Sequence, residues 1–389
     1  MKTTIISIFV IYNITLLSIS LVDHITLTPE EQFLFNNYTF EELFKKGKHY
    51  KVIGDVANAF HYLKPALVKH PNDWSVNWDL GDMYLLVGDF KRGFAGFKFR
   101  WQHDPLYKEK LWRGEDLHNK TILVYCQWGL GDTFMYVRYL KKLKELGAYV
   151  ICASQKPLVK LLSNCPYIDN VIVLSDPKPS FDYQVPITYL PEVFETRLES
   201  IPADIPYLFV DDKYIQEWSQ KIRTNKKYKI GICWQGALRE DPQTIGRAMK
   251  LRDLLPLFDV SHVELYSLQR GYGAEQINDL PASYKIHVFD DTFDTEHGAF
   301  IDTAAVMKNL DLIITVDTSI AHLAGGLGVP VWVMLQYACE WRYLVERSDS
   351  PWYPHSMKLF RQSVHGDWTY VIEKIVHELN RSEFFVACA

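Results

Sequence analysis

The chain has 389 residues, of which 48% are hydrophobic and 14% aromatic, so it can bury the cores of two or three domains and is not a disordered protein. Its formal net charge is -5, and its 42 lysines and arginines form no stripe long enough to follow a nucleic-acid backbone, so we expect no nucleic-acid partner. Six scattered cysteines without a CxxC spacing argue against a zinc site and suit buried, reduced thiols.

The chain begins with an apolar run that has three interpretations. Residues 5–22 are mostly apolar, and Lys2 precedes them. Residues 1–24 therefore form an uncleaved membrane anchor, a signal peptide or a packed helix. The run is near the lower length limit for crossing a bilayer, and no cleavage site is clear. The expected location is cytoplasmic or, through residues 5–22, membrane-associated.

Residues 40–112 contain an internal repeat at one constant spacing. The matching pairs are Gly47 and Gly81, Tyr50 and Tyr84, Gly54 and Gly88, Asp55 and Asp89, Phe60 and Phe94, Leu63 and Phe97, and Pro71 and Pro105. This spacing equals the length of a tetratricopeptide unit, in which two helices cross at small and aromatic residues. Two repeats are too few to stand alone, so we expect them to pack on the next domain. They are either a docking surface for a protein or an acceptor, or a structural cap.

From residue 118 onward, short apolar runs alternate with helical segments, which is typical of a parallel sheet with crossover helices. The expected elements are strands at 121–125, 149–153 and 171–174, and helices at 133–146, 157–162 and 211–224. A proline-rich tract at 177–206 is expected to run over the surface. We assign residues 118–225 to one Rossmann-like domain.

A second alternating set follows a polar linker. The expected elements are strands at 229–234, 263–268, 312–316 and 331–334, and helices at 251–258 and 300–307, with a short helix after residue 316. We assign residues 226–379 to a second Rossmann-like domain. The predicted fold is therefore α/β, with two parallel-sheet halves facing a cleft and a short all-α region before them.

The first strand of the first half runs into the turn Gly129-Leu130-Gly131-Asp132. Its two glycines allow a sharp turn and a close backbone approach to a ligand. Asp132 is expected at the mouth of the cleft, at the start of a helix. There it either caps the helix or accepts the proton of an acceptor hydroxyl.

The second half supplies candidate groups for a phosphorylated ligand. Its first strand ends at Gln235-Gly236, and a charged loop follows. Arg247 or Lys250 in that loop is a candidate to neutralise a diphosphate leaving group, and a solvated surface loop is the alternative. Gln269 follows the next strand, where a base or a ribose would be recognised.

The segment Asp317-Thr318-Ser319 follows the buried strand at 312–316 and opens a helix of small residues that carries His322. Free backbone N–H groups and the helix dipole favour a phosphate or diphosphate at this place, and open α/β sheets bind ligands at this edge. A serine or threonine there often only caps the helix, and a lone histidine in an apolar helix is usually a core residue. With the other motifs, we predict a ligand site.

Together these motifs resemble the tetratricopeptide-containing glycosyltransferases, whose catalytic part is similar to the bacterial heptosyltransferases (glycosyltransferase family 9-like). The resemblance covers residues 40–379. The matching segments are 112–117, 127–132, 138–140, 231–236, 267–269, 302–305, 310–330, 349–354 and 359–362.

The resemblance implies a GT-B fold, a nucleotide-sugar donor held mainly by the second half, inverting transfer, and no metal or other cofactor. It implies that Asp132 is the general base and that Arg247 meets the leaving diphosphate. The donor-binding candidates are Gly129, Gly131, Gln235, Gly236, Arg247, Gln269, Asp317, Thr318, Ser319 and His322. A glycan, a lipid-linked glycan or a protein is the implied acceptor.

One region departs from the family pattern. Relatives usually carry Asn after Trp-Gln-Gly and Ser after the loop arginine, where this chain has Ala237 and Ala248. Losing an amide and a hydroxyl weakens a phosphate contact or changes the donor preference. Two other functions therefore remain open. One is a non-catalytic repeat scaffold with a vestigial GT-B region, and the other, less favoured, is a nucleotide-sugar epimerase.

Overall fold

The structure is a computed structural model that describes residues 21–102, 109–222, 226–237 and 246–381. Most of the N-terminal apolar run lies outside these ranges, so the prediction for residues 5–22 stays untested. Within the described ranges, every helix is too short or too polar to cross a membrane.

The N-terminal part is helical. Its helices are α1 (Pro29–Asn37), α2 (Phe40–Ile53), α3 (Val56–Lys69), α4 (Trp74–Leu86) and α5 (Phe90–Gln102). α2 packs on α3 and α4 packs on α5. The two pairs follow the expected repeat, because the starts of α2 and α4 have the same spacing as the starts of α3 and α5. A Cβ atom on Gly81 would lie 2.8 Å from the Gly93 carbonyl oxygen, so the close crossing of α4 and α5 requires glycine. Membership of the tetratricopeptide class stays a prediction.

The first Rossmann-like half has a parallel sheet with the strand order β3-β2-β1-β4. Its elements are β1 (Thr121–Tyr125), α6 (Leu130–Tyr136), α7 (Tyr139–Glu145), β2 (Tyr149–Ser154), α8 (Val159–Leu162), β3 (Asn170–Val173), β4 (Tyr183–Pro186) and α9 (Leu190–Val193). The next helix in the chain, α10 (Asp212–Lys221), packs on α12 (Ile301–Met307) of the second half. The helix expected at 133–146 begins earlier and is broken into α6 and α7.

Strand β4 corrects the expectation that residues 177–206 run over the surface. Val185, Ile187 and Leu190 in this tract are fully buried. The sequence did not predict this strand because the tract is rich in proline, which cannot donate a hydrogen bond to a neighbouring strand. β4 lies at the edge of its sheet, where a proline at the strand end is tolerated.

The second half has a parallel sheet with the order β6-β5-β7-β8-β9. Its elements are β5 (Tyr228–Cys233), α11 (Leu255–Phe258), β6 (Val263–Ser267), α12 (Ile301–Met307), β7 (Leu312–Val316), α13 (Ser319–Leu327), β8 (Val331–Leu335), β9 (Met357–Arg361) and α14 (Thr369–Leu379). β9 and α14 were not among the predicted elements. The predicted α/β class with two parallel-sheet halves is confirmed.

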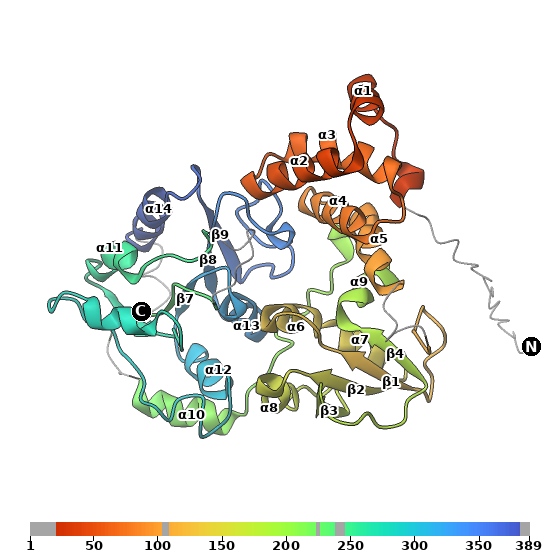
Figure 1. Ribbon diagram of the computed structural model, residues 1–389. Helices are drawn as coiled ribbons and strands as arrows, with labels where there is room; N and C mark the ends of the chain where they lie inside the picture. The colour runs from red at the N-terminus through yellow and green to blue at the C-terminus, as the bar shows by residue number, and fades with distance from the viewer. Residues whose placement is uncertain (1–20, 103–108, 223–225, 238–245, 382–389) are drawn as a thin grey trace, which may run out of the picture.

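The two halves meet where α6 packs on α13, near the centre of the molecule (Figure 1). The buried Arg138 guanidinium also joins them. It donates to the carbonyl oxygens of Met135 at 2.8 Å and Pro202 at 3.0 Å in the first half, and to that of Trp352 at 2.5 Å in the second.

The helical region, red to orange in Figure 1, lies over both halves. α5 contacts α9 of the first half, and α4 contacts the turn Trp341–Tyr343 of the second half. The Trp341 ring lies edge-on to Phe90 and Phe94 of α5, with centroid separations of 6.2 and 5.9 Å. The helical region is therefore packed on the Rossmann-like halves rather than held apart from them.

Candidate functional site

The starts of α6 and α13, one from each half, line the same cavity of about 180 Å³. The predicted residues that line it are Gly129, Gly131, Asp132, Gly236, Arg247, Asp317, Thr318, Ser319 and His322. The fold thus brings together residues that are far apart in the sequence, because both helices start at the carboxyl ends of parallel strands. The N-terminus of α13 at this cavity favours an anion there.

Asp132 lies in the first turn of α6 and uses its two carboxylate oxygens differently. Oδ2 accepts a hydrogen bond from the Gly129 backbone N–H at 3.0 Å, which caps the helix. Oδ1 accepts from the guanidinium of Arg342. The Asp132 side chain is only 15% exposed, so this ion pair is shielded from water. Asp132 is therefore a capping residue and also a charged group at the cavity.

Gly131 allows the two helices to meet. A Cβ atom at this position would lie 3.0 Å from the His322 ring and 3.5 Å from the Ser319 backbone. A larger residue would press on the His322 ring, which would have to shift to make room for it. In this structure the close approach that glycine permits is between the two helices.

Asp317 is buried at the end of β7 and holds two neighbours. Its Oδ1 accepts from the Tyr343 hydroxyl at 2.7 Å, and its Oδ2 lies 3.5 Å from the Arg247 guanidinium. Burial opposes the charge, but Arg247 and the Tyr343 hydroxyl outweigh it and lower the pKa of Asp317. A fixed carboxylate repels a diphosphate, so the geometry favours Asp317 as the group that orients Arg247.

Thr318 and Ser319 begin α13. The Thr318 hydroxyl accepts from the Ile320 backbone N–H at 3.3 Å, so the capping interpretation of Thr318 is confirmed. Ser319 is the first residue of the helix and is half-buried at the cavity. The first turn of a helix has backbone N–H groups without partners inside the helix, and these serve as anion donors.

His322 combines a core position with a cavity-facing edge. It is buried, and its Nδ1 lies 2.8 Å from the Tyr353 hydroxyl oxygen. Burial, helped by the nearby positive charge of Arg342, lowers the pKa of His322 to about 3. The ring is therefore neutral at physiological pH, and it offers a hydrogen bond rather than a charge.

Gln235 and Gln269 line an adjoining cavity of about 380 Å³, which also borders Gly236, Thr318 and Ser319. The Gln269 amide is occupied within the protein. Its Oε1 accepts from the Gln235 backbone N–H at 3.0 Å, and its Nε2 donates to the Tyr272 carbonyl at 2.8 Å. In this structure Gln269 shapes the loop after β5, and its predicted contact with a base or ribose stays a prediction.

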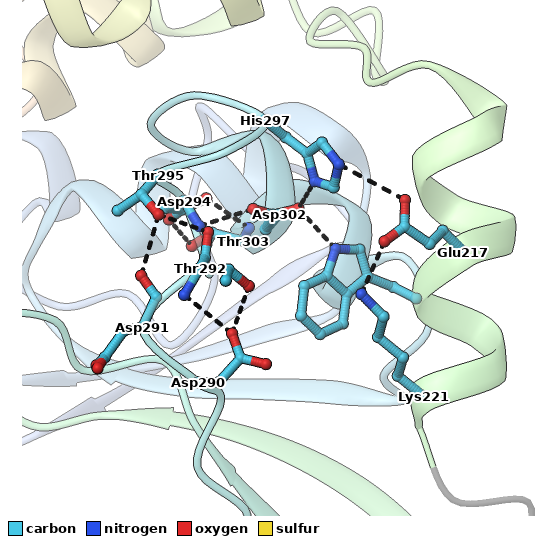
Figure 2. Close-up of polar contacts among 11 residues, drawn as sticks. Glu217, Lys221, Asp290, Asp291, Thr292, Asp294, Thr295, His297, Asp302 and Thr303 are labelled. Carbon is cyan, nitrogen blue, oxygen red and sulfur yellow. Dashed lines mark hydrogen bonds and ion pairs between the residues drawn. The ribbon is translucent and has the colours of Figure 1, made fainter.

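The loop that contributes Asp294, Ala299 and Phe300 to the 380 Å³ cavity is held in place by a buried carboxylate. Figure 2 shows the contacts of this carboxylate. Asp302 is 1% exposed and accepts from the His297 ring at 2.6 Å and from the Asp294 backbone N–H at 2.7 Å. The indole of Trp218, from α10, donates to the same carboxylate at 2.7 Å. Asp294 has a positive φ of 59° and accepts from the Thr303 backbone N–H at 3.0 Å. These contacts fix the loop within the protein.

Sequence reasoning missed the loop after β8, which supplies Glu340, Arg342 and Tyr343. Glu340 and Arg342 line the 180 Å³ cavity, and Tyr343 bonds Asp317. A signal was present, because these polar residues follow a buried strand whose carboxyl end lies at the same edge of the sheet. Across the described ranges, His, Cys, Asp and Glu form no group of three placed to hold a metal ion.

Comparisons with known proteins bear on the fold. No known family model matches the chain. Protein FlbA of Caulobacter vibrioides is 23% identical over 295 residues, which cover 69% of this chain and 48% of that protein. The chain therefore spans about half the length of the curated relative that it matches.

Two solved structures illustrate the likeness. A glycosyl transferase of family 9 from Veillonella parvula has a TM-score of 0.50 and 13% identity, covering 70% of this chain and 93% of that one. The ADP-heptose LPS heptosyltransferase II of E. coli has a TM-score of 0.44 and 13% identity, covering 67% of this chain and 97% of that one. At such identities a likeness shows the fold alone, and the first of the two supports the predicted GT-B arrangement.

Proposed function

We propose that the protein is a glycosyltransferase that moves a sugar from a nucleotide-sugar donor to an acceptor hydroxyl, with inversion and without a metal. One observation carries the proposal. Asp132 of the first half and the start of α13 in the second half line the same 180 Å³ cavity. A base on one side and an anion site on the other are the two parts that such a transfer requires.

The donor would lie along the second half. The nucleoside would enter the 380 Å³ cavity, which Leu268, Phe300 and Ile320 make partly apolar. The diphosphate would lie at the start of α13, within reach of Arg247. This guanidinium and the helix dipole would supply the positive charge that the leaving group needs. The neutral His322 ring would donate a hydrogen bond from the α13 side.

The chemical step follows from this placement. The acceptor oxygen attacks the anomeric carbon from the face opposite the diphosphate, and Asp132 takes the hydroxyl proton. The bond from the anomeric carbon to the diphosphate oxygen breaks, and its electron pair leaves with the nucleoside diphosphate. A single displacement of this kind inverts the anomeric carbon. The ion pair with Arg342 would hold the Asp132 carboxylate in place until the acceptor arrives.

The test is calorimetric titration of the purified chain with UDP, GDP, ADP, CMP, dTDP and their common sugars, including ADP-heptose. Selective micromolar binding that is lost in Thr318→Ala is the expected result, because that change removes the α13 cap at the diphosphate. No binding of any nucleotide would contradict the proposal and favour the non-catalytic scaffold. Turnover of the donor into an isomer, with no acceptor present, would favour the epimerase.

A further inference from the structure

Asp132 also lines a third cavity, of about 530 Å³, which we name the outer cavity. It shares Gly129, Asp132, Glu340 and Arg342 with the 180 Å³ cavity, and it shares no lining residue with the 380 Å³ cavity. The small cavity therefore connects two larger ones. If the donor occupies the cavity beside Gln269, the outer cavity is the space that remains for the molecule that Asp132 deprotonates.

Three parts of the chain form the walls of the outer cavity. The helical region contributes Lys51, Trp78, Asp82 and Arg100, the first half contributes Trp128, and the second half contributes Trp341. A large share of the cavity wall thus comes from helices that precede both Rossmann-like halves. Without α2, α4 and α5 the cavity would lose this share of its wall.

Most polar groups in the outer cavity already have partners. The Lys51 ammonium is buried and lies 2.8 Å from Asp79 and 2.7 Å from Asp82. Arg342 is paired with Asp132. These groups form a fixed polar wall, in which the carboxylate of Asp82 keeps acceptor capacity towards the cavity.

Arg100 differs from them. Its guanidinium lies over the indoles of Trp78 and Trp128, 5.4 and 5.2 Å from the ring centroids, and the side chain is exposed. No carboxylate in the part of the chain that the structure describes forms an ion pair with it. The cavity therefore offers a ligand an unpaired fork of N–H donors beside two half-buried indoles.

We propose that the outer cavity is the acceptor site and that the acceptor is a saccharide, bound in part by the helical region. This inference rests on the proposed function and names the substrate class for it. A sugar ring has an apolar C–H face that suits an indole, and hydroxyls that suit Arg100 and Asp82. Helix side chains and two loops line the cavity, and no strand edge is available there to pair with an extended peptide.

The experiment uses the full chain and the donor identified by titration. Two rates are measured, donor hydrolysis by water and sugar transfer to a panel of p-nitrophenyl glycosides. Arg100→Gln is expected to raise the acceptor KM about tenfold, because it removes a charged hydrogen-bond donor. Trp78→Phe, which keeps an aromatic ring for packing on Phe97, should also raise this KM. Donor hydrolysis should not change in either variant.

Matched controls come from the same helices. Lys91→Gln changes an exposed cation of α5, and Trp74→Phe changes an indole of α4 that is 55% exposed, and neither residue lines the cavity. The inference is wrong if the Arg100 and Trp78 variants transfer like these controls. It is also wrong if no glycoside accepts sugar while the donor is hydrolysed, or if only peptides accept it. Absence of donor binding and hydrolysis would instead contradict the proposed function itself.

Discussion

The outer cavity and the 380 Å³ cavity, which lie on either side of the 180 Å³ cavity, are built in different ways. The 380 Å³ cavity is formed almost entirely by the carboxyl edge of one sheet, between Cys233 and Ile320. The outer cavity is assembled from the helical region, the first half and the second half. On the proposed function, one Rossmann-like half would hold the donor, whereas the acceptor site would also need the appended helices. Changes on the two sides should therefore have separable effects.

The largest effect is expected at Asp132, in the 180 Å³ cavity that connects the two sides. Asp132→Asn keeps a helix-capping oxygen but removes the base, so we expect transfer to fall by about 10²–10⁴-fold with donor affinity unchanged. Initial rates and calorimetric titration measure the two quantities. Asp253→Asn is the matched control, because Asp253 accepts from the Lys250 backbone N–H at 3.0 Å in the same capping geometry. Full transfer activity of Asp132→Asn would exclude the base assignment.

A change in the helical region should affect the acceptor side alone. A Cβ atom on Gly96 would lie 2.5 Å from the Asn77 carbonyl oxygen, so Gly96→Ala must separate α4 from α5. Such overpacking costs about 1–3 kcal/mol of unfolding free energy. We expect a lower melting temperature and weaker transfer, with nucleotide affinity kept. Loss of nucleotide binding in this variant would show that the two sides are not separable.

His322, a buried neutral histidine at the start of the proposed donor site, should make folding stability depend on pH. The pKa of His322 is lowered to about 3 in the folded chain, whereas an unfolded histidine titrates near its ordinary value. As pH falls below that value, only the unfolded state gains the proton, so folding stability is lost. Between pH 7 and pH 5 the wild type should lose about 2 kcal/mol more than His322→Asn. Urea unfolding at the two pH values measures this, and equal losses would contradict it.

The smallest effect is expected at Arg247, and it tests whether Arg247 or Lys250 meets the diphosphate. Arg247 lines the 180 Å³ cavity, whereas Lys250 is exposed and lines none of the three cavities. Arg247→Gln should weaken nucleoside diphosphate binding about tenfold, since a charged hydrogen bond to phosphate is lost. Lys250→Gln, the control, should leave the dissociation constant unchanged. The opposite ranking would move the diphosphate to Lys250.

The sequence predicted the residues at strand ends, but not the residues whose position depends on how the domains pack. The residues that follow strands, such as Asp132 and Asp317, were placed correctly at one cavity, because parallel strands end at one edge of a sheet. Arg342 was not predicted, since its meeting with Asp132 depends on how two halves pack. The cavity positions of Trp78 and Arg100 were not predicted either, because a repeat pattern fixes helix pairing but not which helix face meets another domain.

Arg138 has a consequence for how the molecule comes apart. Its guanidinium is buried and donates hydrogen bonds to carbonyl oxygens of both halves, including that of Trp352. If the second half melted alone, Arg138 would lose its hydrogen bond to the Trp352 carbonyl. Melting of one half therefore removes a contact that the other half uses, and we expect this shared cation to couple the melting of the two halves.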